Sequence, residues 1–268
     1  MTQTPLNPTG LDAYQPSEIA RRIEEAGVRK AHLPFVRLMT LAVLAGAFIA
    51  LGGAFYTVTI AGADPISGPV RLLGGAAFSL GLILVIVGGA ELFTGNALIV
   101  MAWVDRRVSL QELSRNWVIV YCGNLIGALM LVALMALSGL PQGASAEAAR
   151  AIAEGKMALD PVSAFFRGVA CNLLVCLAVW LSFAARDAAG KILAIVWPIT
   201  AFVALGFEHS IANMYLIPIG LTAGASGDLM DIIANLLPVT LGNIVGGAGG
   251  VALAYRLAYG SQAGGSTS

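Results

Sequence analysis

A polar sextet, Glu208-His209-Ser210-Ile211-Ala212-Asn213, interrupts an apolar run that extends from Ile192 to Thr222. Hydrocarbon does not solvate ionisable side chains, so a glutamate and a histidine at membrane depth indicate a functional site. A second apolar run, from Leu72 to Val104, holds a parallel sextet, Glu91-Leu92-Phe93-Thr94-Gly95-Asn96. Both sextets begin with Glu and end with Asn, and no other acidic residue lies deep in an apolar run. Two such copies in matching places predict a transport pathway.

The composition is typical of a membrane protein. Of the 268 residues, 58% are hydrophobic and only 11% are charged, whereas soluble proteins carry about 25% charged residues. The apolar runs predict six membrane crossings, at 38–61, 72–104, 114–138, 162–184, 192–222 and 232–257. We therefore expect an all-α membrane protein with an amphipathic cytoplasmic segment at 1–37, one six-helix transmembrane domain at 38–257 and a disordered cytoplasmic tail at 258–268. The first apolar run follows a polar segment and does not resemble a cleaved signal peptide.

The distribution of charge predicts the orientation. Eleven of the fifteen lysines and arginines fall on one side of the six predicted crossings. The four on the other side are Arg71, Arg150, Lys156 and Arg167. The positive-inside rule therefore places both termini in the cytoplasm. The formal net charge of zero gives no indication of a nucleic-acid partner.

The three cysteines, Cys122, Cys171 and Cys176, all lie in apolar spans. The chain has no Cys-x-x-Cys motif and no histidine cluster, so the cysteines predict packing rather than a metal site or a disulfide framework. No cofactor is expected.

Two of the apolar runs are too long for one straight crossing. Leu72 to Val104 comprises 33 residues, which would form a helix about 50 Å long, although the hydrocarbon core is only about 30 Å thick. Tilt absorbs part of the excess, but the sextets indicate that both helices are interrupted, with Gly88, Gly89, Gly95 and Gly206 permitting sharp turns. Irregular backbone is tolerated in a membrane where it lines a cavity or is buried in protein. A re-entrant hairpin fits less well, because the charge pattern requires each run to cross once.

The chain also repeats itself. The two sextets are offset by 117 residues, and Gly123-Asn124 in the third span matches Gly242-Asn243 in the sixth at an offset of 119. Two matches at nearly one offset predict two three-helix halves, and an odd number of spans makes the second half enter the membrane inverted. Interrupted segments in corresponding places of inverted halves indicate a mid-membrane binding site.

Several strings resemble the formate/nitrite transporter family along nearly the whole chain. They are Phe78-Ser79-Leu80-Gly81-Leu82, Glu91 to Thr94, Asn116-Trp117, Gly123-Asn124, Cys171 to Ala178, Gly206 to Met214 and Pro238 to Asn243. The resemblance implies an aquaporin-like protomer of six helices, with the second and fifth interrupted. It also implies a homopentamer in which each protomer has its own pore.

The resemblance assigns roles to individual residues. His209 matches the family's central pore histidine, and Thr94 matches the threonine that faces it. Phe78, Leu82 and Phe93 match the cytoplasmic-side constriction, to which Phe202 contributes; Asn243 matches the asparagine that hydrogen-bonds the histidine. A supporting polar network is expected from Asn172, Glu208, Asn213, Glu91 and Asn96.

The chemistry of such a site suits a small monovalent anion. A bare charge is prohibitive in hydrocarbon, whereas the protonated acid is a small polar molecule. Histidine titrates near neutrality, so His209 either donates an N–H to the anion or hands it a proton. The sequence around Phe207 to Gly220 resembles the formate members, which makes formate the expected substrate. Nitrite is the runner-up, followed by hydrosulfide and other small monocarboxylates, and passive flow and proton symport both stay open.

Pro16 to Lys30 predicts a short amphipathic helix with Ile19, Ile23 and Ala26 on one face, and with Arg21 paired to Glu25. Two interpretations of this helix are open. In the favoured one, the helix lies on the membrane or on a neighbouring protomer. In the other, it is a pH- or partner-sensitive lid over the cytoplasmic mouth.

Other classes of membrane protein fit less well. An aquaporin carries two Asn-Pro-Ala motifs, and the only Asn-Pro here is Asn7-Pro8. A membrane-embedded enzyme would need a catalytic constellation, which one membrane histidine without metal ligands does not supply. A purely structural membrane protein would leave the paired sextets unexplained. The protein is therefore expected to be a transporter in the bacterial cytoplasmic membrane, in contact with lipid.

Overall fold

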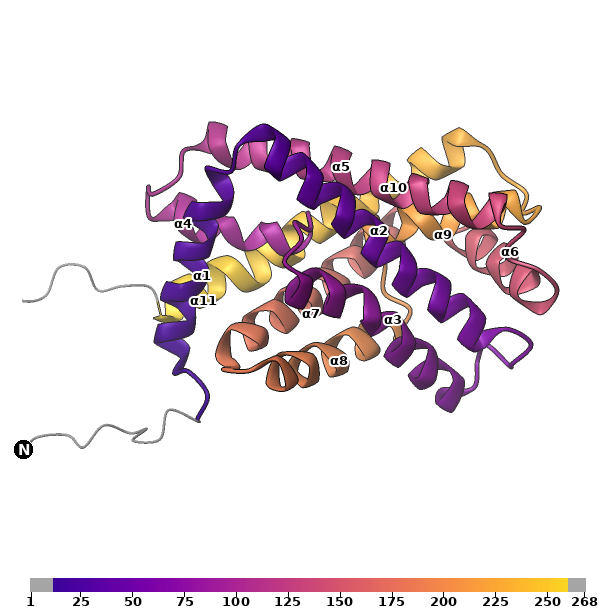
Figure 1. Cartoon of the computed structure of the whole chain (residues 1–268), viewed down its shortest axis with the longest axis horizontal. Coiled ribbons are helices and arrows are strands. Elements are labelled where there is room, and N and C mark those ends of the chain that lie inside the picture. Colours follow the sequence, from indigo (N-terminus) through magenta and orange to yellow (C-terminus); the bar gives the residue numbers. More distant parts are fainter. Residues whose placement is uncertain (1–11, 260–268) are drawn as a thin grey trace, which may run out of the picture.

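A computed structural model of the chain describes residues 12–259, and this part consists of helices with no strand (Figure 1). The predicted tail at 258–268 lies almost wholly outside the described residues. In chain order the helices are α1 (Pro16–Ala31), α2 (Phe35–Ile60), α3 (Gly68–Gly88), the 3-10 helix η1 (Gly95–Ile99), α4 (Val100–Val104), α5 (Leu110–Leu137), α6 (Ala144–Met157), α7 (Pro161–Ala184), α8 (Ala188–Ala204), α9 (Ser210–Thr222), α10 (Leu229–Ile244), the π-helix η2 (Val245–Leu253) and α11 (Ala254–Tyr259).

The long helices match the predicted crossings. Five helical segments of the described chain are long and apolar enough to span a membrane: α2, α3, α5, α7 and the continuous stretch Leu229–Tyr259. The remaining predicted crossing is divided between two shorter apolar helices, α8 and α9. The prediction of an all-α membrane fold with interrupted second and fifth helices is therefore confirmed.

Each interruption follows a left-handed glycine. Helix α3 ends at Gly88, and Gly89 has φ of 82° before the chain runs without helix to Thr94. Helix α8 ends at Ala204, and Gly206 has φ of 73° before α9 begins at Ser210. Positive φ is strained for side chains with a Cβ, so glycine at these two positions permits the turn. Gly88 and Gly95 were also expected to form the first turn, but they lie at the ends of α3 and η1.

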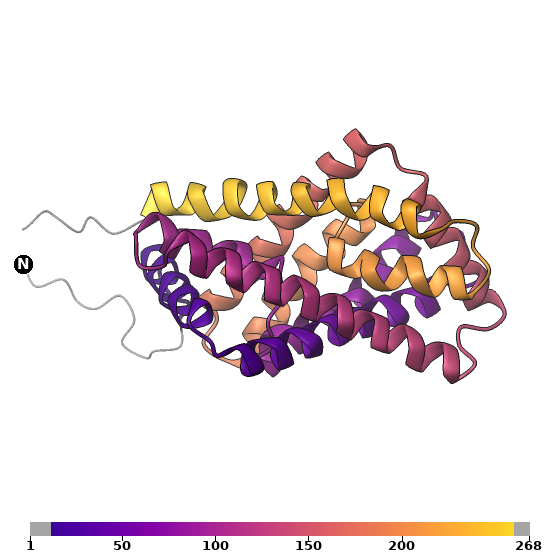
Figure 2. The same cartoon turned by 90° about the horizontal axis from the view of Figure 1, so that it is seen from above.

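The two halves of the chain pack in the same way. Helix α2 packs on α5, α7 packs on α10, and α3 packs on α8. Gly127 of α5 faces the Val43 carbonyl, and its counterpart Gly246 faces the Val169 carbonyl, each so closely that a Cβ would clash. The glycines let the paired helix backbones approach one another. Figure 2 shows α10, η2 and α11, in orange to yellow, as one long continuous rod along one side of the molecule.

Helix α1 covers one end of the molecule rather than extending away from it (Figure 1). Its predicted face is buried, with Ile19 4%, Ile23 3% and Ala26 8% exposed. The face packs against η1, α4, α7 and α11 of the same chain. The apolar face is therefore buried within the chain itself, and contact of the rest of the helix with lipid or a neighbouring protomer stays a prediction. The expected pair of Arg21 and Glu25 is present at 3.6 Å.

Helix α6 was not predicted, because the segment between the third and fourth spans was read only as a connection. It is an amphipathic helix of 14 residues that packs against α9 with Ala149 and Ala153 buried. Gly220 of α9 approaches Ala153 so closely that a Cβ would clash. Helix α6 thus packs against α9, which follows the second interruption, and α1 packs against η1, which follows the first.

Candidate functional site

His209 and Thr94 meet in the buried centre of the fold, where the two interruptions come together. The Thr94 Oγ1 lies 2.9 Å from the His209 Nε2, and the two side chains are 1% and 3% exposed. Each residue sits at the start of a helix, Thr94 before η1 and His209 before α9. The interruptions therefore bring together two residues that are 115 positions apart in sequence.

The hydrogen bonds of His209 define its tautomer. The Ala212 N–H donates to the His209 Nδ1 at 3.1 Å, so the ring caps the N-terminus of α9. A nitrogen that accepts a hydrogen bond carries no proton, and in neutral imidazole the proton then lies on the other nitrogen. The Nε2–H therefore donates to Thr94 Oγ1, which leaves the threonine hydroxyl hydrogen free for a third group.

Asn243 holds the second interruption through backbone groups on either side of the histidine. Its Oδ1 accepts from the Ser210 N–H at 2.9 Å, and its Nδ2 donates to the carbonyl oxygens of Glu208 and Gly168. The expectation that Asn243 bonds the histidine itself therefore differs from the structure. The amide instead fixes the backbone from which the ring projects.

A cluster of one partly exposed lysine, one buried glutamate and two buried asparagines supports each interruption. The Lys30 cluster consists of Lys30, Glu91, Asn96 and Asn116, and the Lys156 cluster consists of Lys156, Glu208, Asn213 and Asn235. In both, the lysine pairs with the glutamate and the first asparagine donates to the glutamate and to the second asparagine. The second asparagine donates to the carbonyl of the lysine.

These clusters contain four of the predicted supporting residues: Glu91, Asn96, Glu208 and Asn213. Asn213 donates to the Glu208 carboxylate, and the Lys156 Nζ lies 2.9 and 3.0 Å from its two oxygens. Sequence reasoning missed Lys156 because it counted the residue only as a charge outside the membrane. The signal was the pair of lysines, Lys30 and Lys156, each near the end of a polar helix.

Two cavities approach the central pair from opposite sides. The α1-side cavity, of about 330 Å³, has the charged lining Arg22, Lys30, Lys191 and Glu91. The α6-side cavity, of about 320 Å³, has the charged lining Arg71, Lys156, Arg167 and Glu208. Three cations and one carboxylate line each cavity, so both favour anions. His209 itself lines the α6-side cavity.

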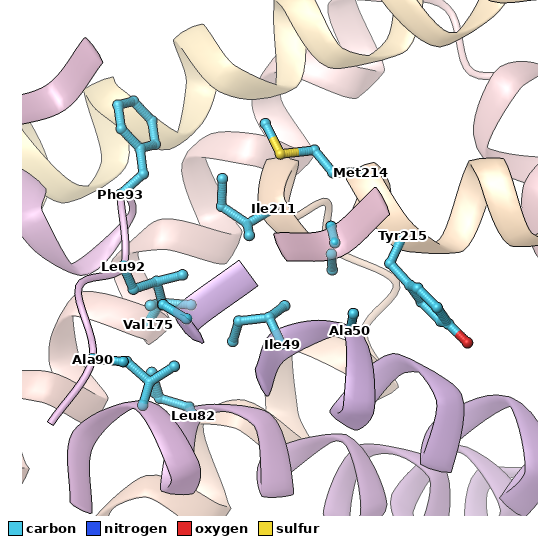
Figure 3. Packing of buried hydrophobic residues seen from close by; sticks show 14 of the residues in the cluster. Ile49, Ala50, Leu82, Ala90, Leu92, Phe93, Val175, Ile211, Met214 and Tyr215 are labelled. Carbon is cyan, nitrogen blue, oxygen red and sulfur yellow. The ribbon is translucent and has the colours of Figure 1, made fainter. Parts of the chain in front are cut away.

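The predicted constriction residues divide between the two cavities. Leu82 lines the α1-side cavity together with Leu92, and Figure 3 shows both side chains in the same buried cluster, with Ala90 and Val175 near them. Phe78 and Phe202 line the α6-side cavity instead. Their rings meet edge to face with centroids 5.6 Å apart, and the Phe202 ring stacks on His209 with centroids 5.9 Å apart.

Phe93 is placed differently from the prediction. It lines neither cavity, and Figure 3 shows its side chain directed away from Leu82. Its ring packs against Tyr121 and Trp117, with centroids 4.9 and 6.0 Å apart. The next-door residue Leu92 takes the predicted place, because successive side chains in the irregular segment point in different directions.

Asn172 lies beside the central pair. Its Nδ2 donates to the Thr94 carbonyl at 3.2 Å and to the Asn243 carbonyl at 2.6 Å. The Cys176 Sγ, one turn later on α7, donates to the same Thr94 carbonyl at 3.4 Å. Asn172 thus bonds the backbone of the threonine loop, while the described residues contain no group of side chains that could hold a metal ion.

Known proteins are similar to this chain in sequence and in fold. A model of the family described as "Formate/nitrite transporter" matches residues 17–257. The chain belongs to the formate/nitrite transporter family. This is a family of membrane transporters, so the protein is a transporter rather than an enzyme.

Individual members of the family are similar over most of the chain. The "Uncharacterized transporter YrhG" of Bacillus subtilis is 46% identical over 91% of this chain and 93% of its own length. The "Formate channel FocA" of Escherichia coli K12 is 41% identical over 93% of this chain and 95% of its own length. A solved structure described as "Pentameric formate channel with formate bound" is 39% identical, covers 84% of this chain and 97% of that one, and has a TM-score of 0.76.

Proposed function

We propose that this member of the formate/nitrite transporter family carries formate across the membrane through a pore in each protomer. The pore would run from the α1-side cavity, past Leu82 and Leu92, to the Thr94–His209 pair and on to the α6-side cavity. The observation that carries the proposal is the buried hydrogen bond between Thr94 and His209, with one cation-lined cavity reaching His209 and the other lined by Gly95 next to Thr94.

The charge of the cavities supports an anionic substrate. Charged clefts with low-dielectric walls raise the local concentration of the opposite charge. Each carboxylate in the lining, Glu91 or Glu208, is neutralised by its own lysine. The remaining arginines and Lys191 then give both cavities a positive field.

The apolar side chains between the cavities support a small substrate. Hydrophobic necks oppose hydrated ions, and the chain places leucines on one side of the centre and phenylalanines on the other. Such a neck passes a small acid or a dehydrated monovalent anion more readily than a large or multivalent one.

The tautomer of His209 decides which group donates a hydrogen bond to the anion. If the ring gave its only proton to formate, an imidazolate would remain unless Nδ1 took up another proton, and Nδ1 is occupied by the Ala212 N–H. We therefore infer a hydrogen-bond chain in which His209 donates to Thr94 and the threonine hydroxyl donates to the anion. Any proton that accompanies formate would then come from water in the cavities, rather than from the histidine as hypothesised from the sequence.

The assembly and orientation follow from the same reasoning. We propose a homopentamer, because a solved relative at 39% identity is described as pentameric. We place the α1-side cavity in the cytoplasm of a bacterial cell, with both termini on that side, because the larger share of lysines and arginines falls there. Helix α1 lines that cavity and would act as its lid.

Formate uptake into liposomes that carry the purified protein tests this function. We expect saturable uptake that nitrite inhibits, and an inward proton gradient distinguishes symport, which it accelerates, from passive flow, which it does not. Uptake no faster than in empty liposomes, for formate, nitrite and hydrosulfide alike, would contradict the proposal.

A further inference from the structure

The two halves of the fold share one scaffold, but the central site breaks their symmetry. At the offset of 117 residues, His209 corresponds to Leu92 and Thr94 corresponds to Ile211. The polar pair at the centre is therefore built from one residue of each half, and neither has a polar counterpart. Other departures from symmetry near the centre are candidates for residues that the pair requires.

Asn172 is one such departure. Asn124 donates to the Ala42 carbonyl and Asn243 to the Gly168 carbonyl, so α2 and α7 correspond at an offset of 126 residues. At that offset the counterpart of Asn172 is Gly46. A Cβ on Gly46 would clash with the Asn124 carbonyl, whereas the Asn172 amide donates to the Asn243 carbonyl.

Gly247 is the matching departure on the facing helix. Its counterpart, at the offset of 119 residues, is Ala128, which lies within the uninterrupted helix α5. Gly247 instead lies in the π-helix η2. A Cβ on Gly247 would clash with the Asn172 Nδ2, and it would come within 2.7 Å of the Ala97 Cβ and 2.9 Å of the Cys176 Sγ.

The Asn172 amide therefore occupies the space where a Cβ of residue 247 would lie, and it donates to the Thr94 carbonyl. Asn172, Gly247 and Thr94 form one packed group, since Asn172 and Cys176 both donate to the Thr94 carbonyl. A π-helix is rare in proteins and is frequent at functional sites. The corresponding part of the first half is the ordinary α-helix α5, and the counterpart of Asn172 in that half is Gly46, which has no side chain.

We propose that Gly247 in the π-helix η2 is a positioning residue for the Thr94–His209 pair, acting through Asn172. Gly247 leaves space for the Asn172 amide, which ties the carbonyl of Thr94 to the carbonyl of Asn243. The Asn243 side chain in turn fixes the backbone next to His209. The separation of the two side chains that face the substrate is thus set from the sixth span, which contributes no side chain of its own to the pair.

A set of four variants tests the proposal, which rests on the proposed transport function only for its second readout. The variants are Gly247→Ala, Asn172→Gly, the double variant with both changes, and the control Gly249→Ala, where a Cβ meets nothing within 4 Å. The first readout is the melting temperature of the purified protein in detergent. The second is formate uptake into liposomes as a function of pH.

We expect Gly247→Ala to lower the melting temperature and to slow uptake by roughly tenfold, since it displaces an amide with two hydrogen bonds. In the Asn172→Gly background, Gly247→Ala should cost little. The double variant then has glycine and alanine at these two positions, as the first half has at Gly46 and Ala128. Non-additivity of this kind is the mark of residues that act through one contact. Gly249→Ala should behave as wild type, and Asn172→Gly should alter the pH profile of uptake.

Two results would overturn the inference. One is a folded Gly247→Ala variant with the wild-type uptake rate and pH profile. The other is an equal loss from Gly247→Ala with and without Asn172, which would assign the effect to Ala97 or Cys176. If Gly247→Ala alone fails to fold, recovery of folding in the double variant supports the pairing. If wild type carries no formate, the proposed function fails, and the melting temperatures still decide whether Gly247 acts through Asn172.

Discussion

Asn124 and Asn243 hold the two helix interruptions with the same set of hydrogen bonds. Each side-chain oxygen accepts a backbone N–H of its interruption, from Phe93 or from Ser210. Each Nδ2 donates to a carbonyl two residues before that N–H, at Glu91 or Glu208. It also donates to a carbonyl of the neighbouring long helix, at Ala42 or Gly168. The two irregular segments are therefore satisfied by protein groups, as a membrane requires.

Replacing either asparagine with alanine should destabilise the protein strongly. Asn124→Ala leaves the Phe93 N–H and the Glu91 carbonyl without partners, and each unsatisfied group costs about 1–3 kcal/mol. We expect the melting temperature in detergent to fall by on the order of 10 °C. Asn243→Ala should behave alike, since its bonds are equivalent.

Ser138→Ala is a suitable control for Asn124→Ala. Ser138 is exposed at the end of the same helix, and its hydroxyl bonds only the Leu134 carbonyl of that helix. A melting temperature that Asn124→Ala leaves unchanged would show that water satisfies the freed groups.

His209→Asn separates the two roles of the histidine. Asparagine is a good helix N-cap, so it can keep the bond to the Ala212 N–H while removing the ring. Formate uptake should fall roughly tenfold in this variant, because the Nε2–H that donates to Thr94 is lost. Uptake into liposomes, with the melting temperature as a check on folding, measures the effect.

His209→Ala should lose the cap as well, so it should be less stable than His209→Asn by about 1 kcal/mol. An uptake rate that is unaltered by either change would exclude His209 from the pathway.

Lys156→Met should impair both stability and transport. The Lys156 Nζ contacts both carboxylate oxygens of Glu208, and the glutamate is only 4% exposed. Removing one partner of a buried ion pair costs about 3–5 kcal/mol. The double variant with Glu208→Gln should recover much of the melting temperature, because no unpaired charge remains.

The double variant should also recover formate uptake at low concentration, because Arg71 and Arg167 still line the cavity after the neutral pair is removed. Melting and uptake of Lys156→Met and of the double variant therefore separate the stability of the pair from its electrostatic effect. Uptake that stays low in a stable double variant would show that Lys156 acts on the anion as well as neutralising Glu208.

Leu82→Ala and Phe202→Ala should each widen the neck on one side of the central pair. We expect faster leak of larger carboxylates such as acetate and lactate, with formate uptake less affected. Leu193→Ala, at a side chain of α8 that is 64% exposed, is the control for Phe202→Ala. Unchanged selectivity would mean that these residues only pack the core.

The sequence was sufficient to predict the interruptions, because each Glu–Asn sextet lies in an apolar run that is too long for one straight crossing. It also indicated the central histidine and threonine through the family resemblance. The two lysine clusters were not foreseen. Lys30 and Lys156 lie in polar helices outside the apolar runs, and only tertiary packing brings their ammonium groups to Glu91 and Glu208.

The placement of Phe93 could not be predicted for a related reason. A regular helix fixes which side chains share a face, but the segment from Gly89 to Thr94 is irregular. Within it, Leu92 points to the α1-side cavity and Phe93 to the aromatic rings of α5. Similarly, nothing in the glycine-rich string from Gly246 to Gly250 distinguishes a π-helix from an α-helix.

Tyr14→Ala tests whether α1 is a lid. The Tyr14 ring lies between the guanidinium groups of Arg22 and Arg186, 3.5 and 4.0 Å from its centroid, and the Tyr14 N–H donates to the Ala184 carbonyl. These contacts fasten the start of α1 to the link between α7 and α8, over the α1-side cavity. Cation–π contacts contribute about 0.5–2 kcal/mol each, so loss of the ring should loosen this end of the helix.

We expect Tyr14→Ala to speed formate uptake about two- to tenfold, the range that such an energy allows, and to change its pH profile. Tyr14→Phe keeps the ring and should resemble wild type. This comparison leaves Lys30 in place, which deletion of the whole helix would not, so a change in rate is not confounded by loss of the Lys30–Glu91 pair. If Tyr14→Ala transports at the wild-type rate at every pH, α1 is a fixed wall of the cavity rather than a lid.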